Sequence, residues 1–144
     1  MTDTTLDPVL IEAYRRTSFR VADAGFSFAM HIDRPCEALL ECMRRCNVTE
    51  AAYFTAWNPR SEPTPREINE AAQRELEAKL RSQGWRFLAG QGVGSDGNWP
   101  PEPSILVLGM PAATASALAR EYGQNAIVTA RADDGANPKL VLLV

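Results

Sequence analysis

The chain is poor in the residues that usually build metal and redox sites. Its 144 residues include one histidine, His31, and three cysteines. All three cysteines fall in one expected helix, and their odd number argues against the disulfide framework of a secreted domain. A zinc site is also disfavoured, because such sites use several histidines or cysteines at fixed spacings. We therefore expect no metal and no cofactor.

Basic charge and long apolar runs are scarce as well. The formal net charge is −3, which leaves no positive excess to neutralise phosphates, so duplex nucleic acid is not an expected partner. No apolar run approaches the roughly 20 residues of a membrane span, and the N-terminal segment lacks the basic and apolar parts of a signal peptide. We expect a cytoplasmic protein that contacts no membrane. A protein partner and the oligomeric state stay open.

Length and composition fit one domain over residues 1–144, with residues 1–6 as a disordered tail. Hydrophobic periodicity and turn residues predict helices at 7–15, 35–46, 65–83 and 111–122, and strands at 17–23, 26–32, 51–57, 85–89, 104–109, 126–130 and 139–144. The order α-β-β-α-β-α-β-β-α-β-β combines adjacent strand pairs with strand-helix-strand crossovers. It predicts an α+β domain with a mixed sheet of about six or seven strands and three or four helices.

The helix over residues 65–83 is the most clearly defined element. Thr64 is the expected N-cap, Pro65 the first helical residue and Gly84 the C-terminal stop. Its predicted inner stripe consists of Ile68, Ala72, Leu76 and Leu80.

A polar residue, Asn69, falls within this stripe. Burying an unpaired amide costs about 1–3 kcal/mol, so we expect partners for it, and the nearest lie in the loop at residues 58–61. Asn69 either faces a ligand or ties down that loop, and the second interpretation is favoured, because most buried amides are satisfied within the protein.

The helix over residues 35–46 carries the cysteines. A helical wheel places Cys36 and Cys46 on the face of the neighbouring leucines and Met43, where they act as small core residues. Cys42 is placed off that face, as a thiol that could react, although nothing nearby in the sequence would lower its pKa.

Three segments crowd uncharged hydrogen-bonding residues against tryptophan, proline and glycine: Thr55–Ser61, Asn98–Ser104 and Gly123–Ala126. Each lies at the edge of a predicted strand, where folds display binding groups on stiff backbone. We expect the three to form one polar pocket for a sugar, a nucleobase or a similar ring. The candidate ligand-binding residues are Trp57, Asn58, Ser61, Asn69, Trp99, Ser104, Gln124 and Asn125.

Glu102 is the candidate catalytic residue. Proline on both sides restricts its backbone to extended conformations. A carboxylate held beside Trp99 can have a raised pKa and act as general acid or base. The alternative is a salt bridge to Arg60 or Arg86 that holds the loop closed.

Two further patterns carry less weight. Ser61 and Ser104 could act as nucleophiles only beside a base, and His31 is predicted on the polar face of its strand, with no nucleophile-elbow motif at either serine. Residues 92–97 match G-x-G-x-x-G, but the proline-rich segment that follows cannot form the helix of a dinucleotide site. We interpret them as a flexible loop that could close over a ligand or cradle a phosphate.

The same segments resemble the bacterial family catalogued as domain of unknown function 3293. The resemblance rests on Tyr14–Thr17, Thr55–Ser61, Asn69, Gly84–Trp85, Gly92, Asn98–Ser104 and Gly123–Ala126, and it covers nearly the whole chain from about Tyr14. It implies a small stand-alone bacterial protein and supplies no mechanism.

Two functions follow from these observations. The first is a small polar-ligand binding protein, or a hydrolase or transferase, in which Glu102 does proton work and the amides orient a nucleotide-like or sugar-like molecule. The second is a non-catalytic interaction or regulatory module in which the same residues only brace loops. Whether the protein is an enzyme stays open at this point.

Overall fold

The computed structural model of the chain describes residues 6–97 and 99–143. The expected disordered tail therefore lies, apart from Leu6, outside the described residues. The helices are α1 (Pro8–Arg16), α2 (Glu37–Arg45), α3 (Arg66–Ser82) and α4 (Ala112–Glu121), with short 3-10 turns η1 (Pro59–Ser61) and η2 (Ala132–Asp134). The strands are β1 (Ser18–Asp23), β2 (Phe26–Met30), β3 (Glu50–Phe54), β4 (Arg86–Val93), β5 (Glu102–Leu108), β6 (Ala126–Arg131) and β7 (Lys139–Leu142). The α+β class and the predicted order of elements are confirmed.

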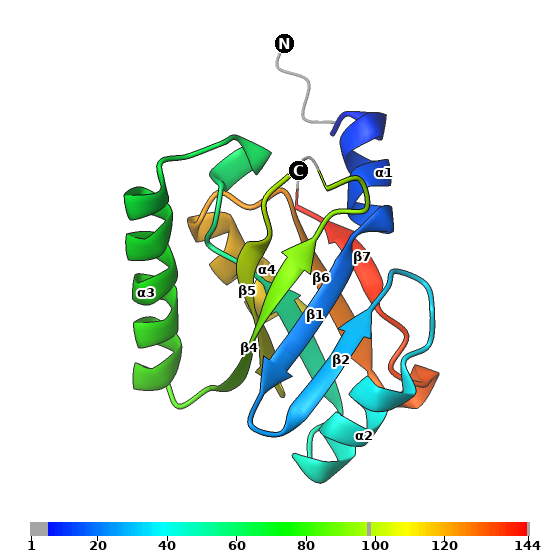
Figure 1. Cartoon of the computed structure of the whole chain (residues 1–144). Coiled ribbons are helices and arrows are strands. Elements are labelled where there is room, and N and C mark those ends of the chain that lie inside the picture. Colours follow the sequence, from blue (N-terminus) through cyan, green and yellow to red (C-terminus); the bar gives the residue numbers. More distant parts are fainter. Residues whose placement is uncertain (1–5, 98, 144) are drawn as a thin grey trace.

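The strands form one curled sheet in the order β2-β1-β4-β5-β3-β6-β7 (Figure 1). All six described pairings are antiparallel, which differs from the mixed sheet suggested by the crossovers. The reason is that each crossover skips a position. The α3 crossover joins β3 to β4 with β5 between them, and the α4 crossover joins β5 to β6 with β3 between them. Strands of the same direction are thus never neighbours.

The segment from β3 to β6 is a split β-α-β-β-α-β unit, the arrangement called ferredoxin-like. Its four strands occupy the centre of the sheet in the order β4-β5-β3-β6. The β1-β2 hairpin extends the sheet beyond β4, and β7 extends it beyond β6. Among the described residues, no helix is both long enough and apolar enough to cross a membrane.

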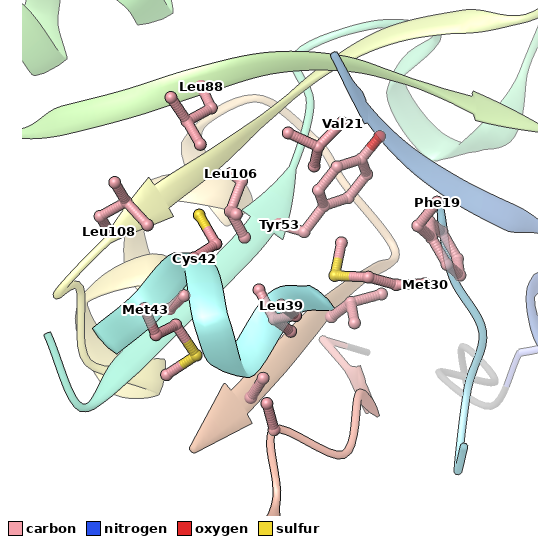
Figure 2. Close-up of a cluster of buried hydrophobic side chains, with 14 of the residues drawn as sticks. Phe19, Val21, Met30, Leu39, Cys42, Met43, Tyr53, Leu88, Leu106 and Leu108 are labelled. Atoms are coloured by element: carbon pink, nitrogen blue, oxygen red, sulfur yellow. The ribbon is translucent and has the colours of Figure 1, made fainter. Parts of the chain in front are cut away.

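The two faces of the sheet carry separate cores. Successive side chains of a strand point to opposite faces, so Tyr53 of β3 joins one core while its neighbours Ala52 and Phe54 join the other. On the first face, α2 packs on the sheet through Leu39, Cys42 and Met43, against side chains such as Tyr53 and Leu106 (Figure 2). On the second face, α3 and α4 pack through the residues Leu76, Leu80, Ala115 and Ala119.

The position of Cys42 corrects the expectation of an exposed thiol. Its exposed fraction is 0%, whereas Cys36 and Cys46 are half-buried. Leu39, Cys42 and Met43 follow the i, i+3, i+4 spacing of a single helical face, which the wheel centred on Cys36 missed. Burial raises the pKa of the Cys42 thiol to about 12, so this side chain is an inert core residue.

The inner face of α3 is also shifted from the prediction. Ile68 is 58% exposed, and the buried residues are Asn69, Gln73, Leu76 and Leu80. The helix therefore presents two amides to the interior in its first half and two leucines in its second. Asn69 is buried as expected, and the burial of Gln73 was not foreseen.

The ends of α3 are partly as predicted. Gly84, with φ of 82°, follows the C-cap, and the Trp85 N–H donates to Leu80 O at 2.9 Å, so the glycine stop is confirmed. The N-cap is Pro65 rather than Thr64. The Thr64 hydroxyl donates instead to Glu62 O at 3.0 Å, so it stabilises the preceding loop.

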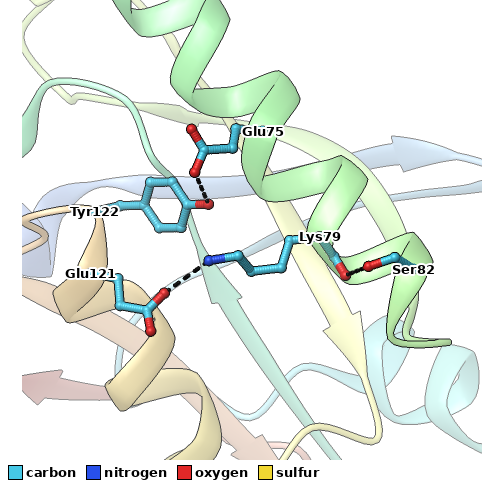
Figure 3. A network of polar contacts seen from close by, with 5 residues as sticks. All are labelled: Glu75, Lys79, Ser82, Glu121 and Tyr122. Atoms are coloured by element: carbon cyan, nitrogen blue, oxygen red, sulfur yellow. Dashed lines mark hydrogen bonds and ion pairs between the residues drawn. The ribbon is translucent and has the colours of Figure 1, made fainter.

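A polar cluster joins α3 to the end of α4 (Figure 3). Lys79 Nζ lies 3.0 Å from Glu121 Oε2, and the Tyr122 hydroxyl donates to Glu75 Oε1 at 3.3 Å. Lys79 also lies over the Tyr122 ring, 5.5 Å from its centroid. These contacts fix the two helices side by side on the second face.

The glycine-rich segment before residue 98 is half strand rather than all loop. β4 continues through Gly90 to Val93 and pairs with β1 on one side and β5 on the other. A Cβ at Gly90 would lie 1.8 Å from Arg20 O. The glycine is thus required for the close approach of two strands, and the loop proper begins at Gly94.

Candidate functional site

A cavity of about 700 Å³ opens at one end of the curled sheet, between α1, the loop after β3, the loop after β4 and the start of β6. All three polar segments contribute to its lining: Thr55, Asn58 and Ser61 from the first, Trp99, Glu102 and Ser104 from the second, and Gln124 from the third. Segments that are far apart in the sequence therefore meet at one hollow. Asn98 lies outside the described residues.

Glu102 stands at the first position of β5, with its side chain half-buried in the cavity. Its Oε2 accepts a hydrogen bond from Trp99 Nε1 and lies 3.4 Å from Asn58 Nδ2. Burial raises the pKa of this carboxyl, and the two donors oppose that rise. The predicted salt bridge is not formed, since neither Arg60 nor Arg86 pairs with Glu102 in the described part of the chain. Among the described residues, the donors that hold the carboxylate are the neutral groups of Trp99 and Asn58.

A chain of hydrogen bonds joins Asn125, which lies outside the described cavity lining, to the lining residues Ser61 and Tyr14. The Asn125 Nδ2 donates to Ser61 Oγ at 3.2 Å, and Ser61 Oγ lies 2.6 Å from the Tyr14 hydroxyl. Burial raises the pKa of Tyr14, and the charge of Glu102 raises it further. Tyr14 therefore stays protonated at neutral pH. A protonated tyrosine is a poor base, so this chain does not activate Ser61 as a nucleophile.

Tyr14 lies on α1, which lines the cavity along most of its length. The sequence analysis named Tyr14 only among the residues of the family resemblance, so its role as a polar lining residue was missed. No residue of α1 is buried. The hydrogen bond between Tyr14 and Ser61 is accordingly a main link between this helix and the loop after β3.

Two buried amides of α3 hold the loop after β3 in place. Asn69 accepts from the Asn58 N–H at 2.8 Å and donates to Asn58 Oδ1 at 2.8 Å and to Thr64 O at 3.1 Å. Gln73 Oε1 accepts from the Ala56 N–H at 2.9 Å and lies 3.1 Å from the Thr55 hydroxyl. Neither amide lines the cavity. Asn69 thus has the loop-tying contacts of the favoured interpretation, and it supports the site through Asn58.

The braced loop has an unusual backbone. Asn58, Arg60 and Ser61 have φ values of 47°, 59° and 58°, a left-handed region that costs about 1–3 kcal/mol for a non-glycine residue. The Arg60 N–H donates to Gly123 O at 2.7 Å, and the Thr64 N–H donates to Asn58 Oδ1 at 3.0 Å. Strained conformations of this kind persist where the surroundings determine them, and they concentrate at functional sites.

The third segment packs against this loop. Gly123 has φ of 67°, and a Cβ there would lie 3.0 Å from Pro59 Cβ, so glycine permits the close packing. Gln124 Nε2 donates to Trp57 O at 3.2 Å and to Tyr122 O at 3.3 Å. Gln124 therefore both lines the cavity and binds loop backbone.

The remaining candidates are Trp57, whose ring is outside the described lining, and Ser104, which lies in it. Trp57 contributes its backbone, since its N–H donates to Thr55 Oγ1 at 2.9 Å, and its ring is not part of the described lining. Ser104 is buried and donates to Glu102 O at 3.0 Å. His31 follows the end of β2 and is likewise absent from the described lining. The structure does not bring a histidine to either serine.

The deep wall of the cavity is apolar. It is formed by Phe19, Tyr53, Val128 and Leu140, which also belong to the core on the α2 face or pack against it. Phe19 and Tyr53 meet edge to face with ring centroids 5.6 Å apart. The Tyr53 hydroxyl is turned away to Arg20 O at 2.8 Å, so the wall offers a ligand carbon surface.

Charged groups at the rim are partly neutralised. Arg16 Nε lies 3.0 Å from Glu12 Oε1, and both side chains are more than half exposed. Within residues 6–97 and 99–143, no group of three or more histidine, cysteine, aspartate or glutamate side chains could hold a metal ion. The site consists of one half-buried carboxylate, hydroxyls and amides around an apolar wall.

The fold and site define a small α+β protein with a mainly apolar cavity that three remote polar segments help to line. Residues 54–127, half of the chain, match the profile of a family described as a protein of unknown function, DUF3293. The chain belongs to this family. The match begins at the end of β3 and ends in β6, so it contains all three polar segments. Comparisons with curated proteins and with solved structures find no match.

Proposed function

We propose that the cavity binds a small polar molecule and that Glu102 transfers a proton to or from it. The observation that carries the proposal is the convergence of three remote segments on one hollow of about 700 Å³, with the carboxylate of Glu102 inside it. This volume is in the range of roughly 300–1,000 Å³ that is usual for sites of small ligands. A nucleoside-like or sugar-like ring has matching hydrogen-bonding groups and size.

The lining disfavours a phosphorylated ring. Arg16 is the one arginine or lysine in the described lining, and it is exposed and paired with Glu12. A phosphate would bring negative charge towards Glu102 without a free basic partner. The nucleotide-like ligand of the sequence analysis is therefore narrowed to a nucleoside or base.

Hydrolysis or group transfer is the chemistry that this site could perform. Burial holds the pKa of Glu102 above its usual range, which brings a carboxyl closer to the operating pH of a general acid or base. Asn58 and Trp99 would keep the carboxyl group aimed, and Tyr14 and Gln124 would orient the ligand. Ser61 has no base beside it, so the proposal uses no serine nucleophile.

The experiment is a thermal-shift screen of the full chain against nucleosides, bases and sugars, with two matched variants. Gly92 lines the cavity, and a Cβ there meets no atom closer than 3.9 Å, so Gly92→Leu fills the cavity without a backbone clash. Gln91→Leu introduces the same side chain at the neighbouring exposed position. A pocket ligand stabilises the wild type and Gln91→Leu but not Gly92→Leu. Equal shifts in all three would refute the pocket.

The catalytic part of the proposal has its own readout. For any hit that is turned over, Glu102→Gln should lower kcat by about 10²-fold or more, as expected for loss of a general acid or base. Unchanged turnover in Glu102→Gln would remove the catalytic role and leave a binding protein.

A second function is favoured by a different observation. Asn69, Gln73 and Gln124 all bind backbone of the loop after β3, as an interaction or regulatory module would require of residues that only brace loops. This alternative predicts that no small molecule in the screen separates Gly92→Leu from Gln91→Leu.

A further inference from the structure

The apolar wall and the single buried carboxylate together restrict the chemistry of the ligand. This step rests on the proposed function, because it concerns the same cavity. The hydroxyls and amides of the lining could bind many different rings. The charge that a ligand carries beside Glu102 is what distinguishes among them.

Glu102 lacks a cation. In the part of the chain that the structure describes, its carboxylate contacts the Trp99 N–H and the Asn58 amide, and no lysine or arginine forms an ion pair with it. A half-buried carboxylate satisfied by neutral donors gains most from a partner that brings a positive charge, because charge-assisted hydrogen bonds are roughly twice as strong as neutral ones.

The groups around Glu102 do not compete for that role. Tyr14 faces it from α1 and stays protonated and neutral, and Ser104 on β5 uses its hydroxyl for Glu102 O. Arg16 at the rim is occupied by Glu12.

The apolar residues of the same lining favour a ligand with a carbon surface. Phe19, Tyr53, Val128 and Leu140 face the cavity with apolar surface, because the Tyr53 hydroxyl is bonded to Arg20 O. Burying apolar surface against them stabilises a complex. A ligand that uses both features has a ring to pack against the apolar residues and a charged group to pair with Glu102.

We propose that the ligand is a ring compound bearing a basic nitrogen, with the ring against this wall and the protonated nitrogen paired with the carboxylate of Glu102. The chemical class is the arylalkylamines, in which an aliphatic amine is attached to an aromatic or heteroaromatic ring. The Tyr14 hydroxyl and the amides of Asn58 and Gln124 serve the remaining polar atoms of the ring. Phosphorylated and carboxylated relatives of such compounds are rejected by the same carboxylate.

The test uses three indole probes of nearly equal size that differ in charge: tryptamine, indole-3-ethanol and indole-3-acetate. Binding is measured by titration calorimetry with the wild type, Glu102→Gln and Glu67→Gln. Glu67 is an exposed carboxylate on α3 outside the cavity lining, so its variant removes the same net charge elsewhere.

Tryptamine is expected to bind the wild type and Glu67→Gln about tenfold more tightly than indole-3-ethanol, one charge-assisted contact being worth roughly that factor. Indole-3-acetate should bind most weakly. In Glu102→Gln, tryptamine and indole-3-ethanol should bind with about the same affinity. The affinity of this variant for indole-3-ethanol should stay within a factor of about three of the wild-type value.

The affinity for tryptamine should also fall as the pH drops, since protonation of Glu102 removes the pair while the amine stays charged. The titratable and charged groups that share the cavity are Tyr14, Tyr53, Glu12, Asp96 and Arg16. The drop should therefore be absent in Glu102→Gln, which isolates the contribution of this one carboxyl from theirs.

Failure of this inference differs from failure of the proposed function. If the alcohol or the acid binds as tightly as the amine, or if the amine preference survives in Glu102→Gln, the cationic ligand is refuted. In that case the cavity is still supported as the binding site if Gly92→Leu abolishes the binding of the probes. If none of the probes binds, the inference is refuted, and the nucleoside and sugar screen alone decides the pocket.

Discussion

At the scale of single residues, the site depends on amides whose partners lie elsewhere in the sequence. Asn69 and Gln73 are buried on α3 and bind the loop that carries Asn58. Burying an amide is costly without partners, so these two residues fix the loop rather than fill space. Residues of this loop have left-handed backbone conformations, which a free peptide would rarely adopt outside glycine.

Glu102 gives a prediction on pH dependence. Burial raises its pKa in the folded protein above the unfolded value of about 4.3. The folded state then binds the proton more tightly, so the free energy of unfolding falls as the pH rises from the unfolded to the folded pKa. Glu102→Gln cannot ionise, and its stability relative to the wild type should therefore increase across this window. Urea unfolding at a series of pH values from about 4 to 7 measures the difference.

The control for this prediction is Glu67→Gln. Glu67 is exposed, and the stability difference between this variant and the wild type should change less over the same pH range. A difference for Glu102→Gln that is flat, or that declines as the pH rises, would contradict a raised pKa.

The sequence revealed the buried amide of Asn69 and the carboxylate of Glu102 because each breaks a local pattern. Asn69 interrupts an apolar stripe, and Glu102 is enclosed by prolines. Gln73 and Tyr14 gave no such signal. Gln73 is ordinary on a solvated helix face, and Tyr14 fits an apolar stripe, so only their contacts in the folded chain distinguish them.

At the scale of elements, periodicity was a reliable guide to helices and strands, and glycine was not a reliable guide to loops. The predicted strand ended before Gly90, whereas β4 continues to Val93. Glycine is common in turns, but here it allows β4 to approach β1. Whether a glycine lies in a turn or at a close contact between strands depends on the neighbouring strand. A single sequence does not show which strands are neighbours.

This interpretation of Gly90 is testable with a neighbouring glycine. Gly90→Ala places a Cβ 1.8 Å from Arg20 O, whereas a Cβ at Gly94 meets nothing closer than Asp96 Oδ1 at 3.9 Å. Gly90→Ala should lower the free energy of unfolding by about 1–3 kcal/mol or more, as overpacking does. Gly94→Ala should change it by no more than about 0.5 kcal/mol. Equal effects in chemical denaturation would mean that the two strands can separate at this point without cost.

At the scale of the whole molecule, one sheet separates two cores. The core on the α2 face continues into the cavity lining through Phe19, Tyr53 and Val128, and Phe54 and Ile127 of the core beneath α3 and α4 also line the cavity. Both cores use alternate side chains of the same strands. The sheet therefore couples them, although no side chain belongs to both.

This arrangement predicts cooperative unfolding. Leu39 and Leu76 are both fully buried, one in each core. Leu39→Ala and Leu76→Ala should each cost about 2–5 kcal/mol. Each variant should still unfold in one transition, with tryptophan fluorescence and far-UV circular dichroism giving the same midpoint. Separate midpoints for the two probes would show that the cores melt independently.

The strand that bears Glu102 has a consequence for how the carboxyl group responds to a ligand. β5 is paired on both sides, and its first residues are Glu102 and Pro103 after Pro101. If β5 slipped by one residue along its neighbours, the carboxyl group would turn to the other face of the sheet. A proline nitrogen, which has no hydrogen to donate, would then take the place of a backbone N–H. The pairing of β5 with β4 at Glu102 thus fixes the backbone of this residue, while Trp99 and Asn58 orient its carboxyl group. Trp99 and Asn58 can give up their hydrogen bonds to the carboxyl group when a ligand binds, and the backbone of Glu102 will keep its position.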